Sequence, residues 1–239
     1  MSKLQVTPTF VNTKNVRNFQ VMMDALALGA GEGRLGLVYG RAGRGKTRTA
    51  QWYHAHNDCV FLRMATVWRT SELYFLQALC KECGIAAPAG RKGPAFAQVV
   101  DELLTRPRPI FLDEIEKLPK FFLDLVRDIS DLSTAPVILI GEDELHSYMQ
   151  QNRRVWSRTY QQLHFQPIEV ADAMVYFKEI AGVQLPVDAA KLLHQNSGGD
   201  FRIIRRDTLS IIHYANAKGT DQITVDLVQL ATKSGLTGR

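Results

Sequence analysis

The chain contains only three cysteines, Cys59, Cys80 and Cys83, among its 239 residues. An odd number of thiols cannot form a closed disulfide framework, and so few suit a reducing compartment. Cys80 and Cys83 have C-x-x-C spacing, but no second pair and no suitably spaced histidine follows them, so a tetrahedral zinc site lacks ligands. We therefore expect Cys80 and Cys83 to be a pair of semi-buried thiols, and we expect neither a disulfide scaffold nor a zinc module.

Long apolar runs are missing as well. No stretch approaches the roughly 20 apolar residues that a membrane-spanning helix needs. The first ten residues also lack the charged start, apolar run and cleavage site of a signal peptide. We therefore expect no membrane association and a cytoplasmic location. Apolar residues make up 46% of the chain and charged residues 22%, which is typical of a globular protein that buries a core.

Carboxylates are absent from two windows of the sequence, although the net charge is only +5. Neither residues 1–20 nor residues 33–57 contain an aspartate or a glutamate. The second window holds five cations: Arg34, Arg41, Arg44, Lys46 and Arg48. Such clusters indicate either an anion-binding site or a solvated basic surface.

Residues 40–47 match the phosphate-loop pattern G-x-x-x-x-G-K-[ST]. An apolar run at 35–39 predicts a strand before it, and a helix is predicted directly after it. Gly40, Gly43 and Gly45 would let the backbone wrap around phosphate groups. The amides and the helix N-terminus would add positive charge. A nucleotide site is therefore expected here.

Three side chains of this loop have expected roles at the nucleotide. Lys46 would reach the β and γ phosphates, and Thr47 would offer its hydroxyl to Mg²⁺. Arg48 is placed with them among the nucleotide-binding residues.

A second motif lies downstream, where an apolar run at 110–112 leads into Asp113 and Glu114. The run predicts a central parallel strand whose carboxyl end faces the ligand crevice. Asp113 would hold Mg²⁺ through water, and Glu114 would polarise the attacking water. The alternative is a strand that ends in an exposed acidic turn.

Alternating apolar runs and amphipathic stretches predict an α/β fold with a parallel five-stranded sheet and flanking helices. Strands are expected at 35–39, 59–63, 110–112, 136–140 and 163–165, and helices at 71–83, 95–104 and 120–130. Beyond residue 169 the pattern is helical only, at 171–181, 187–195, 202–217 and 225–233. We expect a nucleotide-binding core with a short N-terminal extension over 1–168 and a small helical lid domain over 169–239.

Taken together, these motifs resemble the AAA+ ATPases over nearly the whole chain. The resemblance implies Mg²⁺-dependent ATP hydrolysis and an arginine that reaches the nucleotide of a neighbouring subunit. The pair Ser157-Arg158 resembles the family's Ser-Arg pair, so Arg158 is the expected finger and Arg154 the alternative. Residues 197–202 are similar to the second sensor, which implies that Arg202 contacts the γ phosphate.

The first sensor departs from the family pattern. That position usually carries Asn, Thr or Ser at the end of the fourth strand, whereas here Gly141 and Glu142 follow Ile140. A carboxylate would repel the γ phosphate unless a cation lies close. The identity of the first sensor stays open from sequence.

Within the AAA+ ATPases the sequence is most similar to transposition regulators of the MuB and TnsC kind. Residues 10–13, the compact spacing of the two motifs and residues 137–145 carry this likeness. It implies a homo-oligomer, expected as a filament, that binds double-stranded DNA without reading its sequence and works with a transposase. Loop residues expected to contact phosphates are Arg69, Thr70, Lys117 and Lys120; residues 91–93 are the alternative.

Two other functions compete with this one. A remodelling ATPase of the helicase-loader or ExeA-like kind would act on a protein partner. A P-loop enzyme that phosphorylates a small molecule is disfavoured by Arg202 in a helical lid and by the Ser157-Arg158 pair.

Overall fold

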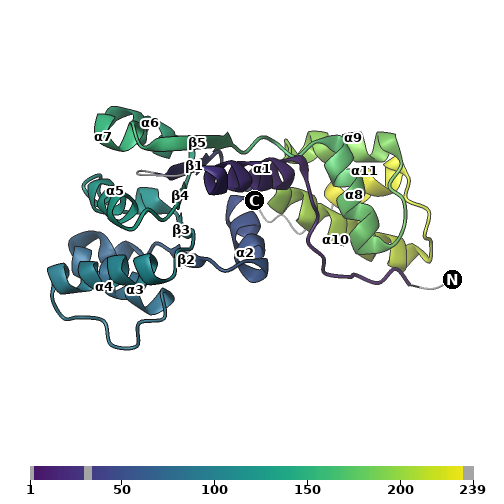
Figure 1. Ribbon diagram of the computed structural model, residues 1–239. Helices are drawn as coiled ribbons and strands as arrows, with labels where there is room; N and C mark the ends of the chain where they lie inside the picture. The colour runs from purple at the N-terminus through teal and green to yellow at the C-terminus, as the bar shows by residue number, and fades with distance from the viewer. Residues whose placement is uncertain (1–2, 30–33, 234–239) are drawn as a thin grey trace. The chain divides into compact units, whose positions relative to one another are not determined.

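The computed structural model describes residues 3–29 and 34–233. Its centre is a parallel five-stranded sheet in the order β2-β3-β4-β1-β5 (Figure 1). This confirms the predicted α/β fold. The strands are β1 (Leu35–Tyr39), β2 (Val60–Arg63), β3 (Ile110–Asp113), β4 (Val137–Ile140) and β5 (Thr159–His164).

Helices cover both faces of the sheet (Figure 1). Those on the first face are α1 (Lys14–Leu28) and α2 (Lys46–His56). Those on the second face are α3 (Glu72–Glu82), α4 (Lys92–Thr105), α5 (Phe122–Ser133), α6 (Asp143–Gln151) and α7 (Arg153–Trp156). Two short 3₁₀ helices, η1 (Thr66–Thr70) and η2 (Ile115–Lys117), follow β2 and β3.

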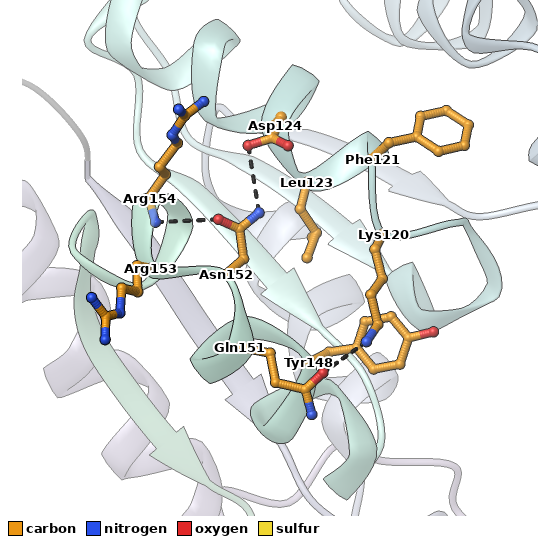
Figure 2. A pocket seen from close by; sticks show the side chains of 9 residues that line it. All are labelled: Lys120, Phe121, Leu123, Asp124, Tyr148, Gln151, Asn152, Arg153 and Arg154. Atoms are coloured by element: carbon orange, nitrogen blue, oxygen red, sulfur yellow. Dashed lines mark hydrogen bonds between the residues drawn. The ribbon is translucent and has the colours of Figure 1, made fainter.

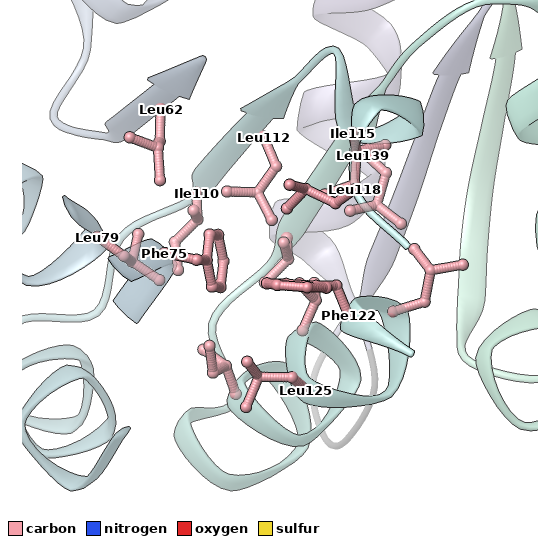
Figure 3. Close-up of a cluster of buried hydrophobic side chains, with 14 of the residues drawn as sticks. Leu62, Phe75, Leu79, Ile110, Leu112, Ile115, Leu118, Phe122, Leu125 and Leu139 are labelled. Atoms are coloured by element: carbon pink, nitrogen blue, oxygen red, sulfur yellow. The ribbon is translucent and has the colours of Figure 1, made fainter. Parts of the chain in front are cut away.

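Successive side chains of each inner strand enter different cores, because a strand alternates its faces. On β3, Phe111 packs with Phe19 of α1, whereas Ile110 and Leu112 pack with Phe75 and Phe122 from the second face (Figure 3). Burial on both faces explains why the inner strands are almost continuously apolar.

The edge strand β5 is longer than the sequence predicts. It begins at Thr159, and its residues alternate between half-buried and exposed. The polar stretch before Leu163 therefore gives no apolar run, and the prediction found only the last part of the strand. The residues after β4 form α6, which the sequence showed only as an acidic turn.

The remaining helices form a second compact unit, made of residues 166–233 together with 3–17 and 42–45. These helices are α8 (Val170–Ala181), α9 (Val187–Ser197), α10 (Phe201–Lys218) and α11 (Val225–Lys233). Phe177, Leu193 and Ile211 are fully buried in its core. The N-terminal segment lies along this unit, since the Thr7 amide donates to the Ile180 carbonyl at 3.0 Å.

All three cysteines are free and buried, so Cys80 and Cys83 are more fully covered than the semi-buried pair that the sequence predicts. Within the described ranges, no helix combines the length and the apolar character needed to cross a bilayer.

The aromatic cluster around Phe19 makes a testable contribution to stability. Phe19 is fully buried, with ring centroids 5.7 Å from Tyr53, 5.9 Å from Phe111 and 6.5 Å from Phe165. We expect Phe19→Ala to lower the free energy of unfolding by about 3–5 kcal/mol, because it removes buried surface and leaves a cavity. Urea unfolding followed by tryptophan fluorescence measures this change.

Tryptophan fluorescence reports on the compact unit that contains Phe19, because Trp52, Trp68 and Trp156 all lie in that unit. Val21→Ala on the same helix is the control; Val21 is 66% exposed, and its truncation should change the free energy by less than about 0.5 kcal/mol. Equal losses in the two variants would contradict this account of the core.

Candidate nucleotide-binding site

The phosphate loop joins β1 to α2, and its glycines are required by the backbone. Gly40, Gly43 and Gly45 have φ angles of 141°, 81° and 96°, which residues other than glycine rarely adopt. A Cβ on Gly40 would lie 2.7 Å from the Phe165 carbonyl oxygen. The spacing of glycines in the motif therefore follows from the loop's shape.

The tip of the loop is bonded to the beginning of α10. The Phe201 amide donates to the Gly43 carbonyl at 2.9 Å, and the buried Arg44 guanidinium donates to the Gly198 carbonyl at 3.0 Å. The Asp200 carboxylate caps α10 by accepting from the Arg202 amide at 2.8 Å. The segment expected to carry the second sensor is therefore hydrogen-bonded to Gly43 and Arg44, which belong to the same compact unit, and Arg202 itself is exposed.

Lys46 is buried at the first position of α2. Its ammonium donates to the Gly40 carbonyl and, at 3.0 Å, to the Arg41 carbonyl. Burial lowers the pKa of Lys46, while the carboxylates of Glu142 and Glu116 oppose that shift. The ammonium is therefore held inside the loop that would surround phosphate groups. Arg48 is exposed on the same turn.

A hydroxyl and a carboxylate meet where α2 faces the end of β3. Thr47 Oγ1 donates to Asp113 Oδ1 at 3.2 Å. Asp113 is buried, and its Oδ2 has no hydrogen-bond partner among the described residues, with Arg63 Nε 3.9 Å away. Burial raises the pKa of Asp113. This pair of oxygen ligands fits Mg²⁺, which prefers one or two protein oxygens together with phosphate oxygens and water.

No cluster of three or more His, Cys, Asp or Glu that could hold a metal ion occurs among residues 3–29 and 34–233. For a Mg²⁺ ion held by Thr47 and Asp113, the remaining ligands would come from the nucleotide and from water.

Glu114 follows β3 in a left-handed conformation, with φ 59° and ψ 39°. Its carboxylate pairs with Arg63 at the end of β2 and with Lys117 in η2. The hydrogen bond from Arg63 is the main reason that the pKa of Glu114 is lowered, and Lys117 adds to the effect. A strained backbone at a charged residue points to function; Thr134, which also has a positive φ, only ends α5.

Sequence reasoning missed Arg63 and Glu116. Arg63 stands opposite Asp113 in the sheet register, so it faces both motif carboxylates. In the sequence, Arg63 is visible only as a charged residue at the end of an otherwise apolar strand. Glu116 is half-buried, and burial raises its pKa; within residues 3–29 and 34–233 its Oε2 has no hydrogen-bond partner.

Glu116 also bears on the open first-sensor position. A Cβ on Gly141 would lie only 2.3 Å from Glu116 Oε2. The end of β4 therefore faces a side chain from the neighbouring loop, while Glu142 is exposed at the start of α6.

The two candidate finger arginines have different surroundings. Arg158 Nε lies 3.3 Å from both carboxylate oxygens of Asp131 on α5. Arg154 is exposed, and no ion-pair partner for it is found in the described part of the chain. A surface ion pair of the Arg158 kind is worth only about 0–1 kcal/mol, so Arg158 can exchange Asp131 for another anion.

The residues expected to contact DNA follow β2 and β3. The carboxyl ends of these strands lie at the same edge of the sheet, because the two strands are parallel neighbours. Arg69 and Thr70 are exposed in η1. Lys117 is engaged with Glu114. Lys120 donates to Gln151 at 2.8 Å and lies 4.2 Å from the centre of the Tyr148 ring (Figure 2).

Comparison with known proteins agrees with this geometry. Residues 30–149 match the protein family described as AAA domain. The Mu-like prophage FluMu DNA transposition protein B of Haemophilus influenzae is 24% identical over 206 residues, which cover 82% of this chain and 70% of that protein. The ATP-dependent target DNA activator B of Escherichia phage Mu is 26% identical over 149 residues, which cover 62% of this chain and 47% of that protein.

This chain therefore spans less than half of the phage Mu relative. Among solved structures, the ORC2 protein of Aeropyrum pernix in its ADPNP-ADP complexes has a TM-score of 0.65 at 17% identity, covering 100% of this chain and 71% of that one. This likeness shows the fold.

The family match spans half of the sequence and includes both the phosphate loop and the end of β3. It confirms the resemblance drawn from the motifs. The chain belongs to the AAA domain family of nucleotide-binding ATPases and, within it, is similar to the transposition B proteins of Mu-like phages.

Proposed function

We propose that this chain is a Mg²⁺-dependent ATPase that assembles on duplex DNA in its ATP-bound form and acts in transposition as target-DNA selector and transposase activator. The observation that carries the proposal is the meeting of Thr47, Asp113 and Glu114 at the end of β3, in a chain similar to named transposition proteins. The phage Mu relative is named an ATP-dependent target DNA activator, which supports the finer assignment.

The residues of the site divide the work of hydrolysis. Loop amides and Lys46 bind the phosphates, with Lys46 exchanging the Gly40 and Arg41 carbonyls for phosphate oxygens. Thr47 and Asp113 hold Mg²⁺, which neutralises charge on the β and γ phosphates when it is bound. Glu114 orients the attacking water once it is released from Arg63 and Lys117.

DNA would act on the same charges. Lys117 pairs with Glu114 and is also an expected phosphate contact, so a DNA phosphate would compete with Glu114 for one ammonium. Arg69 and Thr70 lie in η1, which follows the neighbouring strand β2. They add a cation and a hydroxyl at the same edge of the sheet. Contacts to phosphates fix position without reading bases. DNA binding would thereby favour hydrolysis.

Assembly supplies the last part of the site. Arg158 would leave Asp131 and reach the nucleotide of a neighbouring subunit, so that hydrolysis depends on oligomerisation. An arginine that stabilises the transition-state charge is worth on the order of 10³–10⁵ in rate.

Sedimentation and negative-stain microscopy with linear duplex DNA test the proposal directly. We expect DNA-bound polymers with ATP, none without ATP and none with Lys46→Ala. Polymer formation should fall steeply with salt, because neutralised phosphates release counterions. If no ATP-dependent polymer forms on DNA while a protein partner stimulates hydrolysis, the chain is a protein-remodelling ATPase and the transposition proposal is wrong.

The Arg63–Glu114 pair predicts a gain of activity. Arg63→Ala removes the main cause of the lowered pKa of Glu114 and its main tether. We expect ATP hydrolysis without DNA to rise on the order of tenfold, which corresponds to about 1.4 kcal/mol, and further stimulation by DNA to shrink. A phosphate-release assay with and without duplex measures both rates.

Two variants control this experiment. Arg106→Ala removes a comparably exposed arginine that pairs with Asp58, with side-chain exposures of 59% for Arg106 and 55% for Arg63; its rates should not change. Glu114→Gln in the Arg63→Ala background should abolish the gain. An unchanged basal rate in Arg63→Ala would show that the pair does not restrain Glu114.

Arg158→Ala should remove DNA-stimulated hydrolysis and leave nucleotide binding by the monomer intact. Arg154→Ala is the matched control, since it removes a nearby exposed arginine that has no ion pair in the described structure. Single-turnover hydrolysis and fluorescent-nucleotide binding separate the two steps. A loss confined to Arg154→Ala would transfer the finger role to Arg154.

A further inference from the structure

A groove of about 700 Å³ opens between the start of α5 and helices α6 and α7 (Figure 2). None of its lining residues belongs to the phosphate loop or to the end of β3. The lining residues are Lys120, Phe121, Leu123, Asp124, Tyr148, Gln151, Asn152, Arg153 and Arg154. Its volume is that of a typical ligand or side-chain binding cleft.

The groove has an excess of positive charge. Lys120, Arg153 and Arg154 line it, and none of them has an ion-pair partner within the described structure. The single lining carboxylate, Asp124, is already engaged, because it accepts from Arg127 at 3.1 Å and from Asn152 at 3.4 Å. Three cations therefore remain to face an incoming anion.

The groove also offers apolar surface. Phe121 is 53% exposed, although its neighbour Phe122 is fully buried in the core. Leu123 contributes a buried wall. An exposed phenylalanine beside unpaired cations is typical of a binding surface, where an apolar anchor and charge-assisted hydrogen bonds act together.

One contact argues against a nucleobase stacked in the groove. The Lys120 ammonium lies 4.2 Å from the centre of the Tyr148 ring and donates to Gln151 at 2.8 Å. This cation–π contact occupies a face of the ring, so stacking of a nucleobase there would first have to displace the lysine. A carboxylate or a phosphate oxygen can join Lys120 and leave the contact in place. The exposed Phe121 in the same groove then favours a protein segment, which can supply an apolar side chain together with the anion.

We propose that this groove docks an acidic segment of a partner protein. Carboxylates of the segment bind Arg153, Arg154 and Lys120, and an apolar side chain packs on Phe121. Lys120 is also an expected duplex-DNA contact and Arg154 is the alternative finger, whereas Arg153 and Phe121 belong to neither set and are the residues that the test below changes. Complementary charge of this kind speeds association and selects the partner.

A random-peptide phage display tests the proposal whichever protein carries the acidic segment. Peptides are selected on the full chain and counter-selected on Arg153→Glu, which reverses one unpaired charge at the rim. We expect the surviving peptides to be rich in aspartate and glutamate and to share an aromatic or aliphatic residue. A synthetic copy of the most enriched peptide is then used as the probe in fluorescence anisotropy.

The probe should bind at least about tenfold more weakly to Arg153→Glu and to Phe121→Ala, because each removes one half of the recognition. Arg205→Glu is the control variant. Arg205 is an exposed arginine in the helical unit and does not line the groove, so this variant should bind the probe as the unaltered chain does. Circular dichroism melting of each variant shows that it remains folded.

Three results would overturn the proposal. The selection could return no peptide that discriminates against Arg153→Glu. Arg153→Glu and Phe121→Ala could weaken binding to duplex DNA by the same factor as binding to the probe, which would make the groove a phosphate surface. The two variants could instead abolish self-association of the chain, which would assign the groove to a second copy of the protein.

Discussion

The site depends on how the charges at the end of β3 are balanced. Asp113 and Glu114 are adjacent carboxylates, one buried and one half-buried, and each needs a compensating group. Thr47 donates to Asp113, while Arg63 and Lys117 hold Glu114. These groups come from α2, β2 and η2, so the balance depends on β2 lying beside β3 in the register that places Arg63 opposite Asp113.

The same balance connects nucleotide, DNA and hydrolysis in the proposed function. A nucleotide with Mg²⁺ would provide charge for Asp113, and a DNA phosphate would draw Lys117 away from Glu114. Glu114 would keep its ion pair with Arg63, the first cause of its lowered pKa, but would lose one of its two tethers. Restraint of Glu114 without DNA and its release on DNA follow from one set of ion pairs.

Much of this could be predicted from sequence, because the strongest signals are local. The glycine spacing reflects backbone conformations that few other residues adopt, and the inner strands are apolar because both faces are covered. Arg63 could not be predicted, since its role depends on β2 lying beside β3 in a particular register. The polar half of β5 and the groove beside Phe121 likewise depend on packing that no local pattern reveals.

In the proposed function, the complete site forms only between subunits assembled on DNA. The most direct test is the ATP hydrolysis rate per subunit, measured over a wide range of protein concentration with and without duplex DNA at saturating ATP. We expect this rate to rise with protein concentration and to reach its plateau at lower concentration when DNA is present. A rate per subunit that is constant with concentration and unaffected by DNA would contradict it.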